Sequence, residues 1–306
     1  YYVNLNKTEQ ETQEILNEFK VFFENEKIEK IGQNLKFDLL VLHMWDIKVK
    51  GKLFDTMIAH YLIQPELRHG MDYLAEVYLN YKTINYEDLV GPKGKNQAKI
   101  QTVSLEKLCE YAAEDADITL QLKNILEKEL KEKELENLFY EIEMPLMRVL
   151  SSMETNGVRI DTVALKQSSE VLSKEMQKIE EEIFHLAGIE FNVSSAKQVG
   201  EILFERLKID DKAKKTKTGQ YSTSEEILEK LRSKHPIIEK ILEYRGLKKL
   251  LSTYIDALPN LINKKTGKIH TSYNQTVTST GRLSSTQPNL QNIPIRDEQG
   301  KEIRRA

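Results

Sequence analysis

Two pairs of polar side chains stand four residues apart in stretches with helical spacing. The first pair is Asn34 and Asp38, in the run GQNLKFD, and the second is Tyr111 and Asp115, in YAAED. Residues i and i+4 share one face of a helix. Carboxylate oxygens suit Mg²⁺ or Mn²⁺, and a tyrosine hydroxyl above a carboxylate can hold a metal-bound water. The pattern is compatible with hydrolysis of a phosphodiester assisted by two metal ions. Taken singly, each pair also fits a solvated helix surface.

A second polar stretch lies near the end of the chain, at residues 280–296, and follows a strand-like run over 268–277. Its arginine, asparagine and glutamine side chains suit phosphate oxygens and base edges. The members of interest are Arg282, Asn289, Gln291, Asn292 and Arg296.

The charge is unevenly distributed along the chain. Residues 1–194 carry a net charge of −12 and residues 195–306 a net charge of +9. A basic C-terminal third is typical of a protein with a polyanionic partner, although a lysine-rich helix can also be merely solvated. The basic residues of interest are Lys212, Lys214, Lys215 and Lys217 in a loop, and Arg245, Lys248 and Lys249 in a helix.

Hydrophobic periodicity predicts an α/β first part. Strands are expected at residues 1–6 and 28–32, and helices at 7–26, 36–44, 56–63 and 105–130. Asp55 precedes the helix at 56–63 and can cap it. Cys109 is the sole cysteine, so an internal disulfide is excluded, and we expect it to be a buried apolar side chain.

Residues 130–261 are predicted to be mostly helical. Helices are expected at 142–155, at 162–186, from Ser194 or Ser195 to Leu207, and at 236–258. Thr223 and Glu226 have the spacing of a capping box. At 306 residues the chain is long for one domain, and no apolar run approaches the length that spans a membrane. A cytoplasmic enzyme is therefore expected.

Residues 280–296 resemble the first polymerase-domain motif of the bacterial DNA polymerase I family, the family A DNA polymerases. Residues 30–122 resemble the 3′–5′ exonuclease domain of the same family. The resemblance implies a ribonuclease H-like α/β exonuclease domain at 1–130, a helical thumb at 131–265, and the first strands of a polymerase palm at 266–306. It implies template-directed DNA synthesis in replication and repair, with 3′–5′ proofreading.

The resemblance also implies partners and cofactors. Primer–template DNA, deoxynucleoside triphosphates and two Mg²⁺ or Mn²⁺ ions per active site are expected for the intact enzyme, which we expect to be monomeric and independent of membranes. Under the resemblance Asp38 and Asp115 bind metal, and Tyr111 orients the attacking water. Asn34 would contact the strand being cut. Tyr86 would stack on a base, although core packing is equally open for it.

For the remaining residues the resemblance implies contacts with duplex DNA. Arg282 would reach the minor groove at the primer terminus, where acceptors are positioned alike in all correct base pairs. Arg296 would lie near the template or the incoming nucleotide. The backbone contacts would come from Lys212, Lys214, Lys215, Lys217, Arg245, Lys248 and Lys249, and contacts with primer or template from Asn289, Gln291 and Asn292.

The sequence departs from the family at both ends. No aspartate precedes Asp38, and Glu9 and Glu11, which are two apart, lie in a predicted helix rather than a strand. The two polymerase aspartates and the fingers helix do not appear before Ala306. We therefore expect a fragment of a longer enzyme with little activity alone. A stand-alone 3′–5′ exonuclease and a non-catalytic DNA-binding relative are the alternatives, and the first leaves residues 278–296 unexplained.

Overall fold

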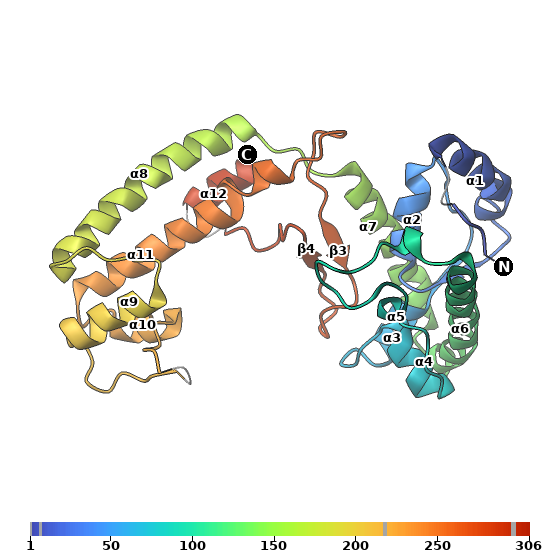
Figure 1. Ribbon diagram of the computed structural model, residues 1–306, viewed down its shortest axis with the longest axis horizontal. Helices are drawn as coiled ribbons and strands as arrows, with labels where there is room; N and C mark the ends of the chain where they lie inside the picture. Colours follow the sequence, from blue (N-terminus) through green and yellow to red (C-terminus); the bar gives the residue numbers. More distant parts are fainter. Residues whose placement is uncertain (1, 6–7, 217–218, 295–297) are drawn as a thin grey trace. The chain divides into compact units, whose positions relative to one another are not determined.

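The computed structural model describes residues 2–5, 8–216, 219–294 and 298–306, which form two compact units. The first unit comprises Tyr1–Gly157 and Thr271–Gln287, and the second comprises Val158–His270 and Pro288–Ala306. After Gly157 the chain forms most of the second unit. It then contributes one hairpin to the first unit before its last segment joins the second unit again (Figure 1). The three domains expected from the resemblance, with boundaries at 130 and 265, stay a prediction.

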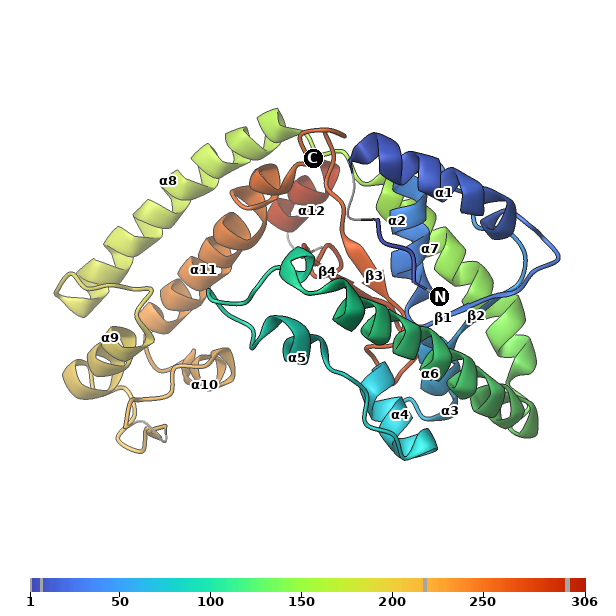
Figure 2. The same ribbon diagram turned by 45° about the vertical axis from the view of Figure 1, so that its right-hand side comes forward.

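The first unit is an α/β structure with a short parallel strand pair. Its strands are β1 (Lys30–Gly32) and β2 (Leu53–Asp55), with Lys30 opposite Leu53. Parallel neighbours need a crossover connection, which α2 (Leu35–Met44) supplies. The other helices are α1 (Glu9–Phe23), α3 (Thr56–Ile63), α4 (Met71–Leu79), α5 (Tyr86–Val90), α6 (Leu105–Glu132) and α7 (Met144–Asn156), with a 3₁₀ turn at Ile100–Thr102 and a π-helical turn at Leu138–Glu143 (Figure 2).

The core of the first unit forms along one face of α6. Leu122, Leu126 and Leu130 are spaced by four residues, and each is fully buried. They belong to the same apolar cluster as Phe54 and Phe139, whose ring centroids are 4.9 Å apart. Burial of this α6 face fixes the rotation of the helix about its axis.

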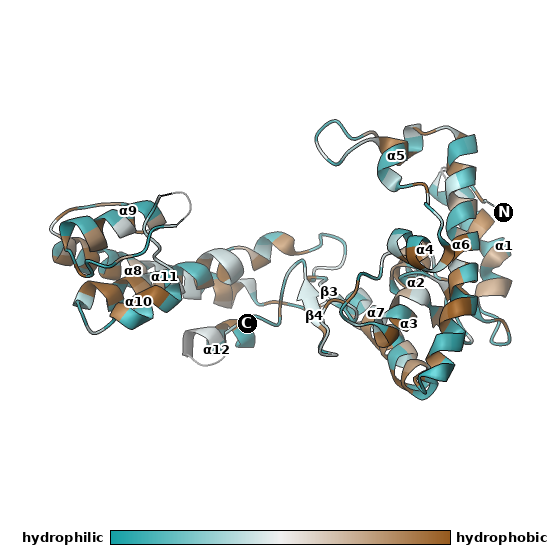
Figure 3. Cartoon of the chain, turned by 90° about the horizontal axis from the view of Figure 1, so that it is seen from below, coloured by the Kyte–Doolittle hydropathy of each residue, from teal (hydrophilic) through white to brown (hydrophobic). Residues whose placement is uncertain are grey.

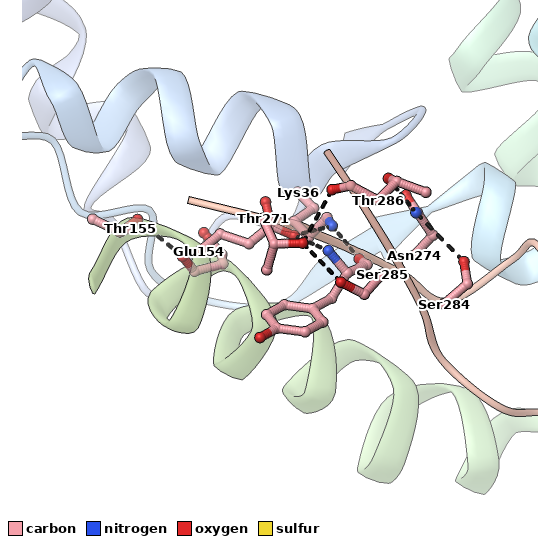
Figure 4. A network of polar contacts seen from close by, with 10 residues as sticks. Lys36, Glu154, Thr155, Thr271, Asn274, Ser284, Ser285 and Thr286 are labelled. Carbon is pink, nitrogen blue, oxygen red and sulfur yellow. Dashed lines mark hydrogen bonds and ion pairs between the residues drawn. The ribbon is translucent and has the colours of Figure 1, made fainter. Parts of the chain in front are cut away.

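The hairpin of β3 (Ser272–Asn274) and β4 (Ser284–Thr286) completes the first unit. Ser272 pairs with Thr286 and Asn274 with Ser284 in antiparallel register. The hydroxyl of Thr271 lies 2.8 Å from that of the fully buried Ser285 and donates to the carbonyl oxygen of Thr286 at 3.0 Å (Figure 4). Polar contacts between side chains therefore supplement a short strand ladder.

The second unit is helical. It contains α8 (Thr162–Ala187), α9 (Ala196–Glu201), α10 (Glu225–Leu231), α11 (Pro236–Leu250) and α12 (Glu298–Arg305), with π-helical turns at Ile202–Arg206 and Leu251–Ile255 and a 3₁₀ turn at Leu258–Leu261. Helices α8 and α11 pack along each other around buried side chains such as Ile183 and Ile241. Figure 3 shows hydrophilic and hydrophobic patches on the same helices, as expected of amphipathic segments.

The main predicted helices are confirmed, while several local predictions are wrong. Residues 2–5 have irregular backbone, and the strand expected over 268–277 is limited to β3, because strand length is set by pairing partners rather than by propensity. The capping box of Thr223 is not formed. Ser224 precedes α10, and the Thr223 hydroxyl accepts a hydrogen bond from Arg245 instead. Cys109 is exposed rather than buried.

Among the described residues, no helix is both long and apolar enough to cross a membrane.

Candidate active site and nucleic-acid interface

The position of helix α2 is set by a buried carboxylate that lies outside it. Asp55, which is 1% exposed, accepts hydrogen bonds from the backbone nitrogens of Leu35 (2.7 Å) and Asn34 (3.2 Å) at the start of α2. It also accepts from those of Met57 (2.8 Å) and Ile58 (3.3 Å) at the start of α3. The predicted cap of α3 is confirmed, and the same side chain caps a second helix. Burial raises the pKa of Asp55, and the four N–H groups oppose that rise.

Asp38 lies on α2, in the turn that follows this double cap. Its side chain is in contact with solvent. Partial desolvation by the surrounding protein nevertheless raises its pKa to about 6, and the negative charge of Asp55 is the second cause. A nearby cation would stabilise the charged form of such an acid. Asn34, at the N-terminus of α2, is exposed and adopts a left-handed backbone conformation with φ of 60°. Its side chain does not cap the helix.

The predicted pairing of Tyr111 with Asp115 on one face of α6 is confirmed. The Tyr111 phenol and the Asp115 carboxylate interact with each other, and both side chains are half-buried. Burial raises the pKa of Asp115, as does the charge of Glu114, while the interaction with the Tyr111 hydroxyl lowers it. Burial and the Asp115 charge raise the pKa of Tyr111, so the phenol remains a proton donor at neutral pH.

Glu114 organises the segment that leads into α5, a role that sequence reasoning missed. Its carboxylate accepts the Tyr81 hydroxyl at 2.7 Å and the backbone nitrogen of Ile84 at 2.8 Å. This tether to α6 brings Tyr86 close enough to Tyr111 to contribute to the raised pKa of that phenol. Tyr86 is 46% exposed, so the alternative that it is a core residue is wrong, and its base-stacking role stays a prediction. The adjacency of Glu114 to Asp115 is the signal that could have identified it.

The chemistry of these acids fits a divalent cation. Asp38 and Asp115 offer oxygen ligands. A bound cation would lower the pKa of each carboxyl group, which the protein alone raises. The part of the chain that the structure describes contains no group of three or more His, Cys, Asp or Glu side chains arranged to hold a metal.

The lysine-rich segment that follows the π-helical turn at Ile202–Arg206 is a loop, as predicted, and an isolated antiparallel bridge joins Lys215 to Tyr221. The backbone nitrogen of Ser222 donates to the Lys214 carbonyl at 3.0 Å, and that of Thr216 donates to the Gln220 carbonyl at 2.7 Å. The Lys215 ammonium lies 4.4 Å from the centroid of the Tyr221 ring. Lys212, Lys214 and Lys215 are all exposed. Lys217 lies outside the described residues.

The basic residues of α11 differ in burial and in the hydrogen bonds that they make within the protein. The Arg245 guanidinium is half-buried, which lowers its pKa, and it donates to both the carbonyl oxygen and the hydroxyl (3.1 Å) of Thr223. Lys248 is exposed and donates a hydrogen bond to the hydroxyl of Ser194. Lys249 is also exposed on this helix. Arg245 therefore has a structural role at the start of α10, and its contact with DNA stays a prediction.

The polar stretch over 280–296 is exposed at each of its described candidate residues. Arg282 follows the turn between β3 and β4. The Asn289 side-chain oxygen accepts from the backbone nitrogens of Gln291 (3.1 Å) and Asn292 (3.2 Å), and the Tyr254 hydroxyl donates to the Asn292 carbonyl at 2.7 Å. These contacts hold the backbone and leave the side chains of Gln291 and Asn292 facing solvent. Arg296 lies outside the described residues.

An α/β unit with a phenol–carboxylate pair, together with a helical unit that carries exposed lysines, is compatible with the class of proteins that bind and cleave nucleic acid. Comparison with known families agrees with this class. Residues 2–131 match the model of a 3′-5′ exonuclease, and residues 162–306 match the model of DNA polymerase family A. The chain belongs to DNA polymerase family A, which confirms the predicted family and fold class.

Individual relatives support the same assignment. The chain is 47% identical to DNA polymerase I of Borreliella burgdorferi over 95% of its length, and 43% identical to that of Pseudomonas aeruginosa over 95%. It spans 31% and 32% of those two proteins. A solved POL domain of Pol1 from M. smegmatis, in complex with DNA primer-template and dNTP, matches 99% of this chain and 49% of its own, with 31% identity and a TM-score of 0.80. The polymerase match over 162–306 is not explained by a stand-alone exonuclease.

Proposed function

We propose that the protein carrying this chain performs template-directed DNA synthesis in replication and repair, with 3′–5′ proofreading, as a nucleotidyltransferase of the DNA polymerase I kind. The observation that carries the exonuclease part is the interaction of the half-buried Tyr111 phenol with the half-buried Asp115 carboxylate on one face of α6. Phosphodiester hydrolysis needs a positioned water and charge near the reacting phosphate. A phenol held by a desolvated carboxylate suits the first need.

In this proposal Asp38 and Asp115 hold Mg²⁺ or Mn²⁺. When bound, two such ions activate water and stabilise the leaving oxygen. Tyr111 donates to Asp115 and orients the attacking water by its oxygen. Tyr86 stacks on a base of the strand being cut, and Asn34 contacts that strand.

The proposed DNA contacts of the remaining residues follow from their exposure and charge. The exposed lysines Lys212, Lys214 and Lys215, together with Lys248 and Lys249 of α11, contact phosphates, as does Lys217. Each should therefore contribute about one unit to the slope of log affinity against log salt. Arg282 donates to minor-groove acceptors at the primer terminus, which are alike in all correct pairs. The partners are primer–template DNA and deoxynucleoside triphosphates, and the enzyme acts as a monomer in the bacterial cytoplasm.

The test is made on the full-length gene product with two substrates. Labelled single-stranded DNA reports 3′–5′ cleavage, and a primed template reports extension, both in Mg²⁺. We expect Asp115→Asn to abolish cleavage while extension continues. The Asp117→Asn variant, which changes an exposed acid on the same helix, is the matched control and should cleave normally. Cleavage that survives Asp115→Asn, or a protein that neither cleaves nor extends, would contradict the proposal.

A further inference from the structure

Tyr61 joins helix α3 to the turn between β3 and β4. It lies within the part of the chain that matches the exonuclease model and is 4% exposed. Its hydroxyl donates to the carbonyl oxygen of Thr278 at 2.7 Å and accepts from the backbone nitrogen of Gly281 at 3.1 Å. These partners are 217 and 220 residues away in sequence and belong to the polymerase match. One phenol thus uses its donor and its acceptor on the same turn.

The turn that Tyr61 holds is the one that ends at Arg282. The Thr278 hydroxyl donates to the Arg282 carbonyl oxygen and so closes the turn from inside. Gly281, directly before Arg282, has a φ of +76°, a conformation that residues with a Cβ atom rarely adopt. The backbone leading into Arg282 is therefore fixed at its start, at its glycine and at its end.

The two sides of this connection are each held by further contacts. The Tyr61 ring meets the ring of buried His69 edge-on, with centroids 5.6 Å apart. On the hairpin, the Gln275 side chain donates to the Glu143 carboxylate at 2.7 Å, and the Thr276 hydroxyl lies 3.4 Å from the Met57 sulfur. The Tyr61 hydroxyl is consequently a fixed point against which the turn is placed.

We propose that Tyr61 is a positioning residue for Arg282, so that the exonuclease fold contributes to the contact with the primer terminus. The inference rests on the proposed function of Arg282. Tyr61 does not touch DNA in this proposal. It restrains the turn, so that the Arg282 side chain starts from a single backbone conformation and loses less conformational freedom on binding.

A double-mutant cycle on the full-length gene product tests the inference. The proteins are wild type, Tyr61→Phe, Arg282→Ala and the double variant, and the measurement is the Kd for primer–template DNA. Loss of the hydroxyl leaves two turn groups without their partner, so we expect Tyr61→Phe to raise Kd by about 3- to 10-fold. In the Arg282→Ala background the same change should leave Kd unaltered, because the side chain that the turn positions is gone.

Two further variants separate positioning from general destabilisation. Thr278→Val opens the same turn from inside and should show the same loss of effect in the Arg282→Ala background. Tyr140→Phe removes a tyrosine hydrogen bond, to Glu127 at 3.3 Å, elsewhere in the first unit and should leave Kd unchanged. Cleavage of single-stranded DNA should be unaffected by Tyr61→Phe.

The outcomes also separate the inference from the function on which it rests. If Arg282→Ala weakens binding but Tyr61→Phe does not, the positioning role alone is overturned. Equal effects of Tyr61→Phe with and without Arg282 would likewise overturn it, since a general loss of stability is additive. If Arg282→Ala leaves Kd unchanged, the proposed contact of Arg282 fails, and the positioning role fails with it.

Discussion

Lys36 and Glu154 form an ion pair in which the two side chains are only 14% and 5% exposed. Both partners also bind the backbone of β3. Glu154 accepts from the Tyr273 nitrogen at 2.7 Å, and Lys36 donates to the Tyr273 carbonyl oxygen (Figure 4). Because Lys36 precedes Asp38 by two residues on α2, this ion pair connects the helix of a candidate metal ligand to α7 and to the hairpin.

Removing the cation from this pair should be strongly destabilising. Lys36→Met removes the positive charge beside the buried Glu154 carboxylate, and we expect the free energy of unfolding of the first unit to fall by about 3 kcal/mol. Urea denaturation measures it. The control is Lys230→Met, which breaks an ion pair with Glu226 whose side chains are 70% and 78% exposed and should change stability by less than about 1 kcal/mol. Equal effects of the two variants would contradict the buried character of the Lys36 pair.

Two buried histidines should make the first unit sensitive to acid. The Nδ1 atoms of His60 and His69 are 2.8 Å apart, so one ring donates and the other must be unprotonated. Burial lowers the pKa of both, and that of His60 falls to about 4. The folded state therefore binds fewer protons than the unfolded state, whose histidines titrate near 6.5. Stability should be complete above about pH 6.5 and decline as the pH falls toward 4.

The measurement for the histidine pair is the midpoint of thermal unfolding between pH 4 and 8. His60→Phe removes one titrating ring and should flatten this dependence. His185→Phe, at an exposed position on α8, should leave the dependence as in the wild type. A wild-type midpoint that stays constant from pH 7 to pH 5 would refute the prediction.

Asp38 should show the opposite sign of pH dependence. Its folded pKa of about 6 is above the unfolded value, so the folded state binds the extra proton and loses stability as the pH rises from about 4 to 6. Asp38→Asn should therefore stabilise the protein at pH 7, by no more than about 1 kcal/mol because solvent screens an exposed side chain. Cleavage should be lost in the same variant. Chemical denaturation at pH 7 decides it, and a destabilised Asp38→Asn protein would count against this reading.

Tyr111→Phe should change the pH profile of cleavage as well as its rate. The interaction with the Tyr111 hydroxyl lowers the pKa of Asp115, so removal of that hydroxyl should raise this pKa. If ionised Asp115 is required, the acid limb of the rate profile should move to higher pH, in addition to a lower maximum. Tyr81→Phe, which removes a different hydroxyl that binds Glu114, is the comparison variant. An unmoved acid limb would mean that the phenol acts only on the water or the substrate.

Local sequence patterns predicted what local interactions determine. The long helices α6 and α8 follow apolar periodicity, and the Tyr111–Asp115 pair needs only helical spacing. What these patterns did not predict includes interactions with partners distant in sequence. Thr223 has the sequence context of a cap, but Arg245 occupies its hydroxyl. Tyr61 lies in a run that indicates a buried helix, and nothing in that run indicates the turn at Thr278, which only the folded chain brings to it.

The double cap formed by Asp55 matters for the choice of a variant that removes the proposed cleavage activity. An asparagine there could offer one acceptor oxygen where four N–H groups now converge, and a glutamate would displace the carboxylate by a methylene. Of the two neighbouring acids, Asp38 is the one that can be neutralised without disturbing the scaffold. Asp55 should be kept, because its side chain caps the N-termini of both α2 and α3, and changing it would disturb both helices.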